Sequence, residues 1–458
     1  MAKGARYLIF FNDIPGIFDF VLDFDILTDV AALAAVSAID DETGETFIKA
    51  LKDGKKLKLK MIGPEKYDLR VRSTNNTNTG GAVSNFSSWG PTFEMDTKPQ
   101  CGAIGGHVLS TYLRASGKYS LNSGTSMACP QAAGIIALIR QVRGAITPQE
   151  IQDLLSSNAN PQLFNDGTKF YDYLAPVPQQ GAGLLQAYDA AYSTALLSPS
   201  GLSFNYTDHF ANSLNFTLRN TDKEPATYNI MHRPAITMPS LTRLFTQPPA
   251  LNSARPASLC KVARPRRLIK VSATPPEGLD AKRLALWSGY IAINGTDGAS
   301  LSLPYQGLTG SLHEHILLGS NDTWISNSTD FNDIPSPIPP NTTFLLPKPG
   351  NAGPEDLMPQ LSVKLALGCP MIRADIVYGL PQPRSQEQDP DARILGFPAL
   401  WNPRGHIGFP WDGLLDSGRY APAGTYKFVV RALRINGDAK KKEEWDVSTT
   451  SAFSIQYL

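Results

Sequence analysis

Short apolar runs separated by turns organise the first sixty residues. Arg6–Asn12 and Val36–Ile39 have the length and the branched or aromatic side chains of strands. Glu45–Lys52, with Phe47 four residues before Leu51, predicts a helix. Lys56–Met61 alternates basic and apolar side chains with a period of two, which predicts a half-buried strand with a solvated charged face.

Helical patterns occupy the next part of the chain. Residues 121–139 pass from a polar turn, which contains Gly124, into an apolar run that is rich in alanine. Small side chains keep a helix thin, so we expect this helix to lie deep in a core. Thr147-Pro-Gln-Glu150 predicts a capping box and a helix to about Ser157. A last helix is expected after residue 187, ending near Leu197.

After residue 198 the pattern changes to short alternating strands, which is typical of β-sandwich domains. The strands are expected at Leu214–Leu218, Tyr290–Ile293, Leu301–Leu303, Leu361–Leu367, Tyr426–Ala432 and Phe453–Tyr457. The basic stretch Arg264–Lys270 is interpreted as a solvated hairpin loop. Residues 330–360 carry eight prolines between positions 335 and 359, which predicts a long connection.

Ser126 stands where the polar turn meets the apolar helix. A helix N-terminus presents unpaired N–H groups and a positive dipole, which stabilise a capping serine or an oxyanion formed beside it. Pro130 fits the first turn, where its missing N–H costs nothing. The residues alone leave two readings open: a serine that only caps the helix, and a catalytic nucleophile.

Three motifs give the chain a family resemblance. Gly124–Pro130 resembles the nucleophile motif Gly-Thr-Ser-Met-Ala-x-Pro of the subtilisin-like serine proteases, the subtilase family. Phe86–Pro91 is similar to the segment Phe-Ser-Ser-x-Gly-Pro of that family, and Gln180–Ala187 is similar to its closing motif. The resemblance implies that Ser126 is the catalytic nucleophile. Gln100 and Ile104 depart from the acid and the proline of the family pattern.

The resemblance also implies a division into domains. Residues 1–63 resemble the end of a protease-associated domain, with an unrelated small α/β unit as the alternative. Residues 64–197 are similar to the C-terminal part of a subtilase catalytic domain, which begins with a polar loop at 64–81. Residues 198–312 resemble a fibronectin type III-like β-sandwich, and 313–458 an immunoglobulin-like domain. The expected fold is multidomain, a partial α/β subtilisin-like region with a parallel sheet and helices, followed by antiparallel β-sandwich domains.

Serine needs a neighbouring base, which in subtilisin comes earlier in the chain, in the order Asp, His, Ser. The one histidine upstream of Ser126 is His107, which we interpret as a surface loop residue. The family motifs for the aspartate, the histidine and the oxyanion asparagine do not occur in these residues. We therefore expect a serine-type endopeptidase sequence that is inactive by itself and exposes apolar surface around its helix. The alternative is a pseudoprotease that binds extracellular proteins or glycans.

The composition and charge of the chain limit the classes of partner and ligand that we expect. A net charge of +1 gives no support for nucleic-acid binding, so we expect protein or peptide substrates. The β domains are candidates for association with a cell surface or membrane. Four cysteines are too few for a disulfide scaffold and are wrongly spaced for zinc, although one or two bridges stay open. His313 and His315 would share one face of a strand and could hold a metal, but they lack further ligands. We expect no cofactor and no metal.

Eight Asn-x-Ser/Thr sequons point to a secretory pathway and to glycosylation. Residues 1–13 contain an apolar core of only five residues, whereas a secretory signal needs about 7–15. No stretch reaches the roughly 18 apolar residues of a membrane span. We expect an extracellular or cell-surface location for the complete protein, with no signal peptide in this chain.

Overall fold

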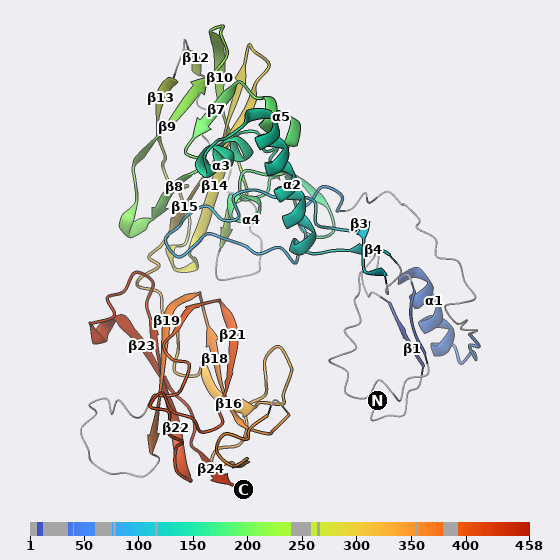
Figure 1. Cartoon of the computed structure of the whole chain (residues 1–458), viewed down its shortest axis with the longest axis vertical. Helices are drawn as coiled ribbons and strands as arrows, with labels where there is room; N and C mark the ends of the chain where they lie inside the picture. Colours follow the sequence, from blue (N-terminus) through green and yellow to red (C-terminus); the bar gives the residue numbers. More distant parts are fainter. Residues whose placement is uncertain are drawn as a thin grey trace. The chain divides into compact units, whose positions relative to one another are not determined.

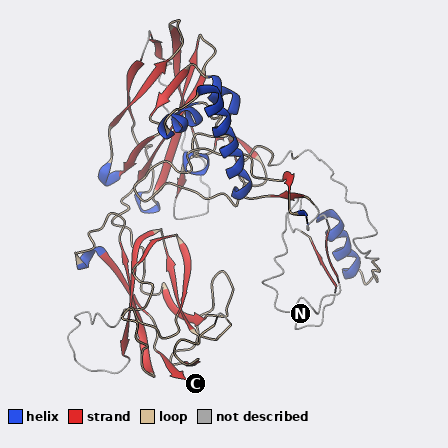
Figure 2. Ribbon diagram, in the orientation of Figure 1, coloured by secondary structure: helices blue, strands red, loops and turns tan. Residues whose placement is uncertain are grey.

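The computed structural model describes residues 7–11, 35–39, 41–59, 76, 79–114, 118–239, 258–262, 266–353, 355–378 and 393–458. It divides into two compact units (Figure 1). The first comprises residues 1–87, 103–137 and 165–170, and the second comprises 88–102, 138–164 and 171–458. The strands of the second unit far outnumber its helices (Figure 2).

Five α-helices lie in the described part of the chain: α1 (Asp41–Lys52), α2 (Thr125–Arg143), α3 (Pro148–Ser157), α4 (Val177–Gln180) and α5 (Ala187–Tyr192). The strands before residue 200 are β1 (Tyr7–Phe10), β2 (Ala35–Ala38), β3 (Val108–Thr111), β4 (Tyr119–Asn122), β5 (Leu163–Asn165), β6 (Phe170–Leu174) and β7 (Ala195–Ser198).

The next strands are β8 (Leu202–Tyr206), β9 (Ser213–Asn220), β10 (Ala226–Pro234), β11 (Met238–Pro239), β12 (Ser258–Val262), β13 (Arg266–Ser272), β14 (Ala285–Gly295) and β15 (Ser300–Thr309). The last are β16 (Thr323–Asn327), β17 (Thr343–Leu346), β18 (Pro359–Leu365), β19 (Cys369–Tyr378), β20 (Ala399–Asn402), β21 (Gly405–Pro410), β22 (Gly424–Leu433), β23 (Trp445–Thr449) and β24 (Phe453–Tyr457).

The first unit contains a parallel pair, β1 with β2, and an antiparallel pair, β3 with β4. Both strands predicted near the start are confirmed. Helix α1 begins at Asp41, four residues before its predicted start, because acidic side chains are favourable in a first helical turn. The strand predicted at Lys56–Met61 is wrong for its described residues 56–59. These form no strand, and Leu57 and Leu59 are 38% and 46% exposed.

The capping box of α3 is confirmed. Thr147 Oγ1 accepts a hydrogen bond from the Glu150 N–H at 3.2 Å, and Glu150 Oε2 accepts one from the Thr147 N–H at 3.3 Å. The helix predicted to end near Leu197 instead ends at Tyr192. Residues 195–198 form β7, because their buried apolar side chains and their backbone pair with β9 in a sheet. The first β domain thus begins inside the predicted subtilase region.

Two sheets form this first β domain. One has the order β12-β10-β14-β15-β8 with β11 beside β14, and the other has the order β13-β9-β7. Buried side chains of both sheets, among them Phe204, Phe216 and Trp287, make its core. The hairpin loop expected at Arg264–Lys270 is wrong for its described residues. Residues 266–272 are strand β13, whose side chains are mostly exposed and whose backbone pairs with β9.

The second β domain repeats the two-sheet plan, with the orders β16-β18-β21 and β17-β24-β22-β19-β20. Strand β23 pairs with β22 at the side. The proline-rich segment 330–360 is largely a connection, as predicted, but it includes strand β17, which pairs in parallel with β24. Buried aromatic residues fill the core, where Trp411 packs edge-on to Phe428 and Phe453.

A short loop from the subtilase-like region, Thr92–Asp96, is inserted between the two β domains; we call it the wedge loop. It closes on itself, because the Met95 N–H donates to Thr92 O at 3.0 Å and the Asp96 N–H donates to Thr92 Oγ1 at 3.0 Å. The side chain of Met95 is fully buried in a core cluster that includes residues of both β domains. The adjacent Phe93 stacks on Trp401 of the second β domain, with ring centroids 5.9 Å apart.

The backbone of Met95 is equally constrained. Its carbonyl oxygen accepts hydrogen bonds from Ser203 Oγ at 2.6 Å and from the buried Gln306 Nε2 at 2.9 Å. Its φ of 66° lies in the left-handed region, which costs free energy for a residue with a Cβ. The buried side chain and the two accepted hydrogen bonds offset this cost. Both the side chain and the backbone of Met95 are therefore held in place by the two β domains.

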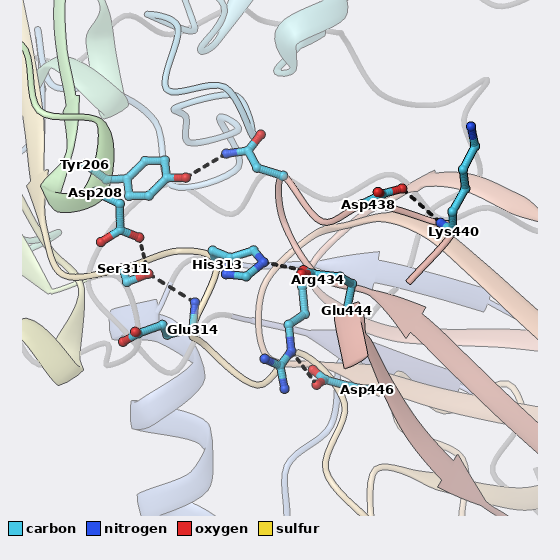
Figure 3. A network of polar contacts seen from close by, with 11 residues as sticks. Tyr206, Asp208, Ser311, His313, Glu314, Arg434, Asp438, Lys440, Glu444 and Asp446 are labelled. Atoms are coloured by element: carbon cyan, nitrogen blue, oxygen red, sulfur yellow. Dashed lines mark hydrogen bonds and ion pairs between the residues drawn. The ribbon is translucent and has the colours of Figure 1, made fainter. Parts of the chain in front are cut away.

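Polar contacts also join the two β domains to each other (Figure 3). Asn436 Nδ2, in the second β domain, donates to Tyr206 Oη, in the first, at 2.9 Å. His313 and His315 lie in an irregular segment, so the strand face predicted for them is wrong. His313 instead pairs with Glu444 within residues 313–458, and Arg434 Nε donates to the nearly buried Asp446 at 3.0 Å.

A buried tyrosine ties the first β domain to the end of the subtilase-like region. Tyr290 of β14 is fully buried, and its hydroxyl donates to Gly181 O at 2.9 Å. Two positions earlier, Ser288 Oγ accepts a hydrogen bond from the Val177 N–H at 3.1 Å. Helix α3 packs on β7 and β15 (Figure 1). Residues 138–164 and 171–192 therefore share a continuous packed interior with the first β domain.

Met95→Ala should destabilise the second unit by about 2–5 kcal/mol, because it removes a fully buried side chain and leaves a cavity between two domains. Glu94→Ala, an exposed neighbour in the same loop, is the matched control and should change the unfolding free energy by less than about 0.5 kcal/mol. Urea unfolding followed by tryptophan fluorescence measures both. Equal midpoints for the two variants would contradict the role given to Met95.

Tyr290→Phe should cost about 1–3 kcal/mol, because it removes one hydroxyl and leaves the carbonyl oxygen of Gly181 buried without that donor. The same urea titration measures the loss. Tyr188→Phe, at an aromatic residue that is 74% exposed, provides the control. An unchanged midpoint for Tyr290→Phe would show that this contact does not hold the domains together.

Candidate active-site segment

Ser126 is the second residue of α2, directly after a turn with special backbone geometry. Gly124 has a φ of +155°, and the Met127 N–H donates to Gly124 O at 3.1 Å, which closes the turn into the helix. Ser126 is exposed, so solvent or a substrate can reach its hydroxyl. The predicted position of Ser126 at the N-terminus of a 19-residue helix is confirmed, and its catalytic role stays a prediction. The placement of Pro130 in the first turn is wrong, because Pro130 is the sixth residue of α2 and lies inside the helix.

The segment Ile104–His107 holds this turn from the other side. The Gly124 N–H donates to Gly105 O at 2.8 Å, and the His107 N–H donates to Ser123 Oγ at 2.8 Å. A Cβ on Gly105 would lie 2.7 Å from Gly124 O and 3.2 Å from the Cβ of Ala128, so this close approach requires glycine. Sequence reasoning missed Gly105, although the Gly105-Gly106 pair is a pattern that marks close backbone approach.

The departure at Ile104 has a local explanation. Its backbone N–H donates to Gln131 Oε1 at 2.6 Å, a hydrogen bond that proline could not make. Gln131 lies in α2, five residues after Ser126, so this bond fixes the loop against the helix that carries the serine. The departure at Gln100 is less informative. The backbone carbonyl of Gln100, which any residue supplies, accepts from the Ala182 N–H at 2.8 Å.

His107 is exposed and has a φ of 51°, as expected of a loop residue. The contact that it makes with the serine turn comes from its backbone rather than from its ring. No proton-transfer partner for Ser126 is thereby identified within the described residues.

Helix α2 is far more exposed than its composition predicts. Of its apolar residues, Ile135 and Ile139 are buried, whereas Leu138 is 53% and Val142 is 44% exposed. The prediction that this helix lies deep in a core is therefore wrong for this chain, because only one face has packing partners. The expectation of exposed apolar surface on the helix is confirmed, and Leu113 and Tyr119, earlier in the chain, are exposed as well.

The cysteines also differ in their exposure to solvent. Cys101 and Cys369 lie among packed residues, and burial raises the pKa of each thiol to about 11. Cys129, three residues after Ser126 on α2, is exposed. All three are free thiols, so no bridge joins any two of them, and the side chain of Cys260 lies outside the described residues.

No group of three or more His, Cys, Asp or Glu side chains in the described ranges is arranged to hold a metal ion. None of the helices described has the length and apolar character needed to cross a membrane.

Iodoacetamide at pH 8 should alkylate Cys129 rapidly and Cys101 and Cys369 slowly. A thiol with a pKa of about 11 is ionised at pH 8 in roughly one molecule in a thousand, and the thiolate is the reactive form. Peptide mapping by mass spectrometry gives the three rates, with urea-unfolded chain as the control in which they converge. Slow labelling of Cys129 in the native chain would contradict the exposed face of α2.

Two segments of the chain match known protein families. Residues 31–188 match the model of the subtilase family, and residues 202–306 match that of an Fn3-like domain. The subtilase match begins within residues 1–63, whose assignment to a protease-associated domain stays a prediction. The match includes Ser126 and the loop that holds its turn.

Three characterised proteases are similar to parts of the chain. C5a peptidase from Streptococcus pyogenes is 38% identical over 127 residues, which are 26% of this chain and 10% of that protein. The minor extracellular protease Vpr from Bacillus subtilis is 30% identical over 209 residues, 44% of this chain and 23% of that protein. The PI-type proteinase from Lactococcus lactis subsp. cremoris is 24% identical over 320 residues, 62% of this chain and 16% of that protein.

The chain thus spans between about a tenth and a quarter of the length of these relatives. The two family matches and the strands of the structure give the order of parts in this chain, a subtilase region followed by β-rich domains. Residues 31–188 therefore belong to the subtilase family, and residues 202–306 are an Fn3-like domain.

Proposed function

We propose that the complete protein is a serine endopeptidase of the subtilisin type, in which Ser126 attacks the scissile carbonyl of a protein substrate. The observation that carries this proposal is the position of Ser126. Its exposed side chain lies in the first turn of α2, and the preceding glycine turn is fixed by hydrogen bonds to Gly105 and His107. A serine held this way has a defined direction of attack and the positive end of a helix dipole beside it.

The reaction would follow the acyl-enzyme course of this family. The Ser126 hydroxyl gives its proton to a histidine base as its oxygen bonds to the carbonyl carbon, and the leaving amine receives that proton. The backbone N–H groups of the first turn of α2 point toward the oxyanion that develops. Water then hydrolyses the ester on Ser126 and regenerates the free hydroxyl.

We propose that this chain alone does not hydrolyse proteins. His107 is the one histidine before Ser126 in the sequence, and the sequence contains no second motif of the triad. Loss of the triad base costs about 10⁶ in kcat in subtilisin, and loss of an oxyanion donor costs about 10²–10³. The complete protein would supply the histidine, the aspartate and the asparagine from residues outside this sequence.

A pseudoprotease that binds extracellular proteins through its β domains is the second candidate. Gln100 and Ile104 favour it, because both depart from the family pattern. The bond from the Ile104 N–H to Gln131 shows a stable local substitute for the proline, so this departure does not require loss of activity. The relatives named as proteases support the first candidate, which also fits a cell-surface or extracellular location.

A fluorophosphonate probe tests the proposal. The in-frame genomic sequence upstream should encode an Asp-x-Gly motif and a His-Gly-Thr motif, and a chain extended to include them should be labelled at Ser126. Ser126→Ala in the extended chain should abolish both labelling and casein hydrolysis. The chain as given should hydrolyse casein no faster than its own Ser126→Ala variant.

Two kinds of result would contradict this proposal. Absence of both upstream motifs, or an extended chain that the probe does not label, would leave the pseudoprotease as the function. Casein hydrolysis by the chain as given, abolished by Ser126→Ala, would contradict the dependence on an external base.

A further inference from the structure

A pocket of about 310 Å³ lies in the second unit, between the last subtilase helices and the Fn3-like domain. Its volume is at the lower end of small-molecule sites. Helices α2 and α3 supply Arg143, Glu150 and Leu154, and strands β7 and β9 of the first β domain supply Leu196 and Arg219. The remaining lining residues are Ile146, Ser193, Thr194, Ala195 and Thr221.

The pocket carries an excess of positive charge. Two guanidinium groups, Arg143 and Arg219, and one carboxylate, Glu150, leave a net charge of +1. Burial lowers the pKa of Arg143, and the positive charge of Arg219 lowers it further, which outweighs the opposing effect of Glu150. The two cations therefore repel each other across a site that one carboxylate does not neutralise.

One nitrogen of the Arg143 guanidinium lacks a hydrogen-bond acceptor. Its Nη2 donates to Ser193 O at 2.5 Å, whereas its Nε is buried and has no hydrogen-bond partner among the described residues. A buried charged donor without an acceptor is costly, and an acceptor in the pocket would remove that cost.

Glu150 is poorly placed to be that acceptor. Its Oε2 serves the capping box of α3, where it accepts from Thr147. Its Oε1 lies 3.6 Å from Arg219 Nη2, beyond hydrogen-bonding range, so this ion pair is loose. The guanidinium of Arg219 is 45% exposed at its side chain and can take a second anionic partner.

We propose that this pocket binds a small organic carboxylate, held between Arg143 and Arg219, with a short branched aliphatic body against Leu154 and Leu196. A guanidinium fork matches the planar carboxylate, and the two leucines, 3% and 7% exposed, form an apolar floor that an inorganic anion would not use. Such a ligand would brace the C-terminal end of α2, at Arg143, against the first β domain.

Calorimetric titration of the full chain with N-acetyl-leucine tests the proposal, with N-acetyl-leucinamide as the uncharged ligand control. The acid should bind saturably and at least about tenfold more tightly than the amide, because only the acid offers two charged acceptors. Arg219→Gln and Arg143→Gln should each weaken binding by about ten- to hundredfold. Lys270→Gln removes one charge on the exposed strand β13, away from the pocket, and should bind as the unchanged chain does.

Arg219→Gln keeps the test decisive if Arg143→Gln fails to fold, since the side chain of Arg219 is nearly half exposed. Equal binding of the acid and the amide, no binding of either, or unchanged binding by Arg219→Gln would overturn the proposal. Inorganic phosphate that binds as tightly as N-acetyl-leucine would also overturn it, because the apolar floor would then contribute nothing.

Discussion

The packing between the two β domains depends on one buried methionine, whose carbonyl oxygen accepts two hydrogen bonds. Met95 comes from the subtilase-like region, yet its side chain lies in a core shared with both β domains, and Ser203 and Gln306 bond to its backbone. The left-handed φ of Met95 persists because these contacts fix the residue from several sides. A residue buried in this way couples its segment to its neighbours, so we expect residues 88–102 to unfold together with the two β domains.

The turn before Ser126 is stabilised in a different way, by local hydrogen bonds. Backbone hydrogen bonds and the glycine approach at Gly105 hold the turn before Ser126, while the outer faces of α2 lie open. A local turn of this kind needs no deep core to keep its shape, because its polar groups are satisfied by near neighbours. The turn before Ser126 can therefore keep its shape even though the helix packing around it is one-sided.

Much of this arrangement was predictable from sequence, and the failures have physical causes. The capping box at Thr147 and Glu150, and most strands after residue 198, follow from local patterns that the fold retains. The helix expected to reach Leu197 gave way to β7, because pairing with β9 outweighs local propensity. The exposure of α2 depends on which segments pack on it, and the wedge loop depends on contacts across more than a hundred residues of sequence. Neither the exposure of α2 nor the packing of the wedge loop can be predicted from a local sequence pattern.

Native-state hydrogen exchange measured by mass spectrometry tests the central claim most directly. If the wedge loop is a fixed part of the second unit, amides in residues 88–102 exchange as slowly as those of β14 and β22, and they open together with them as denaturant is raised. Amides in residues 103–114 exchange faster. Rapid exchange of residues 88–102, independent of the β strands, would contradict the account.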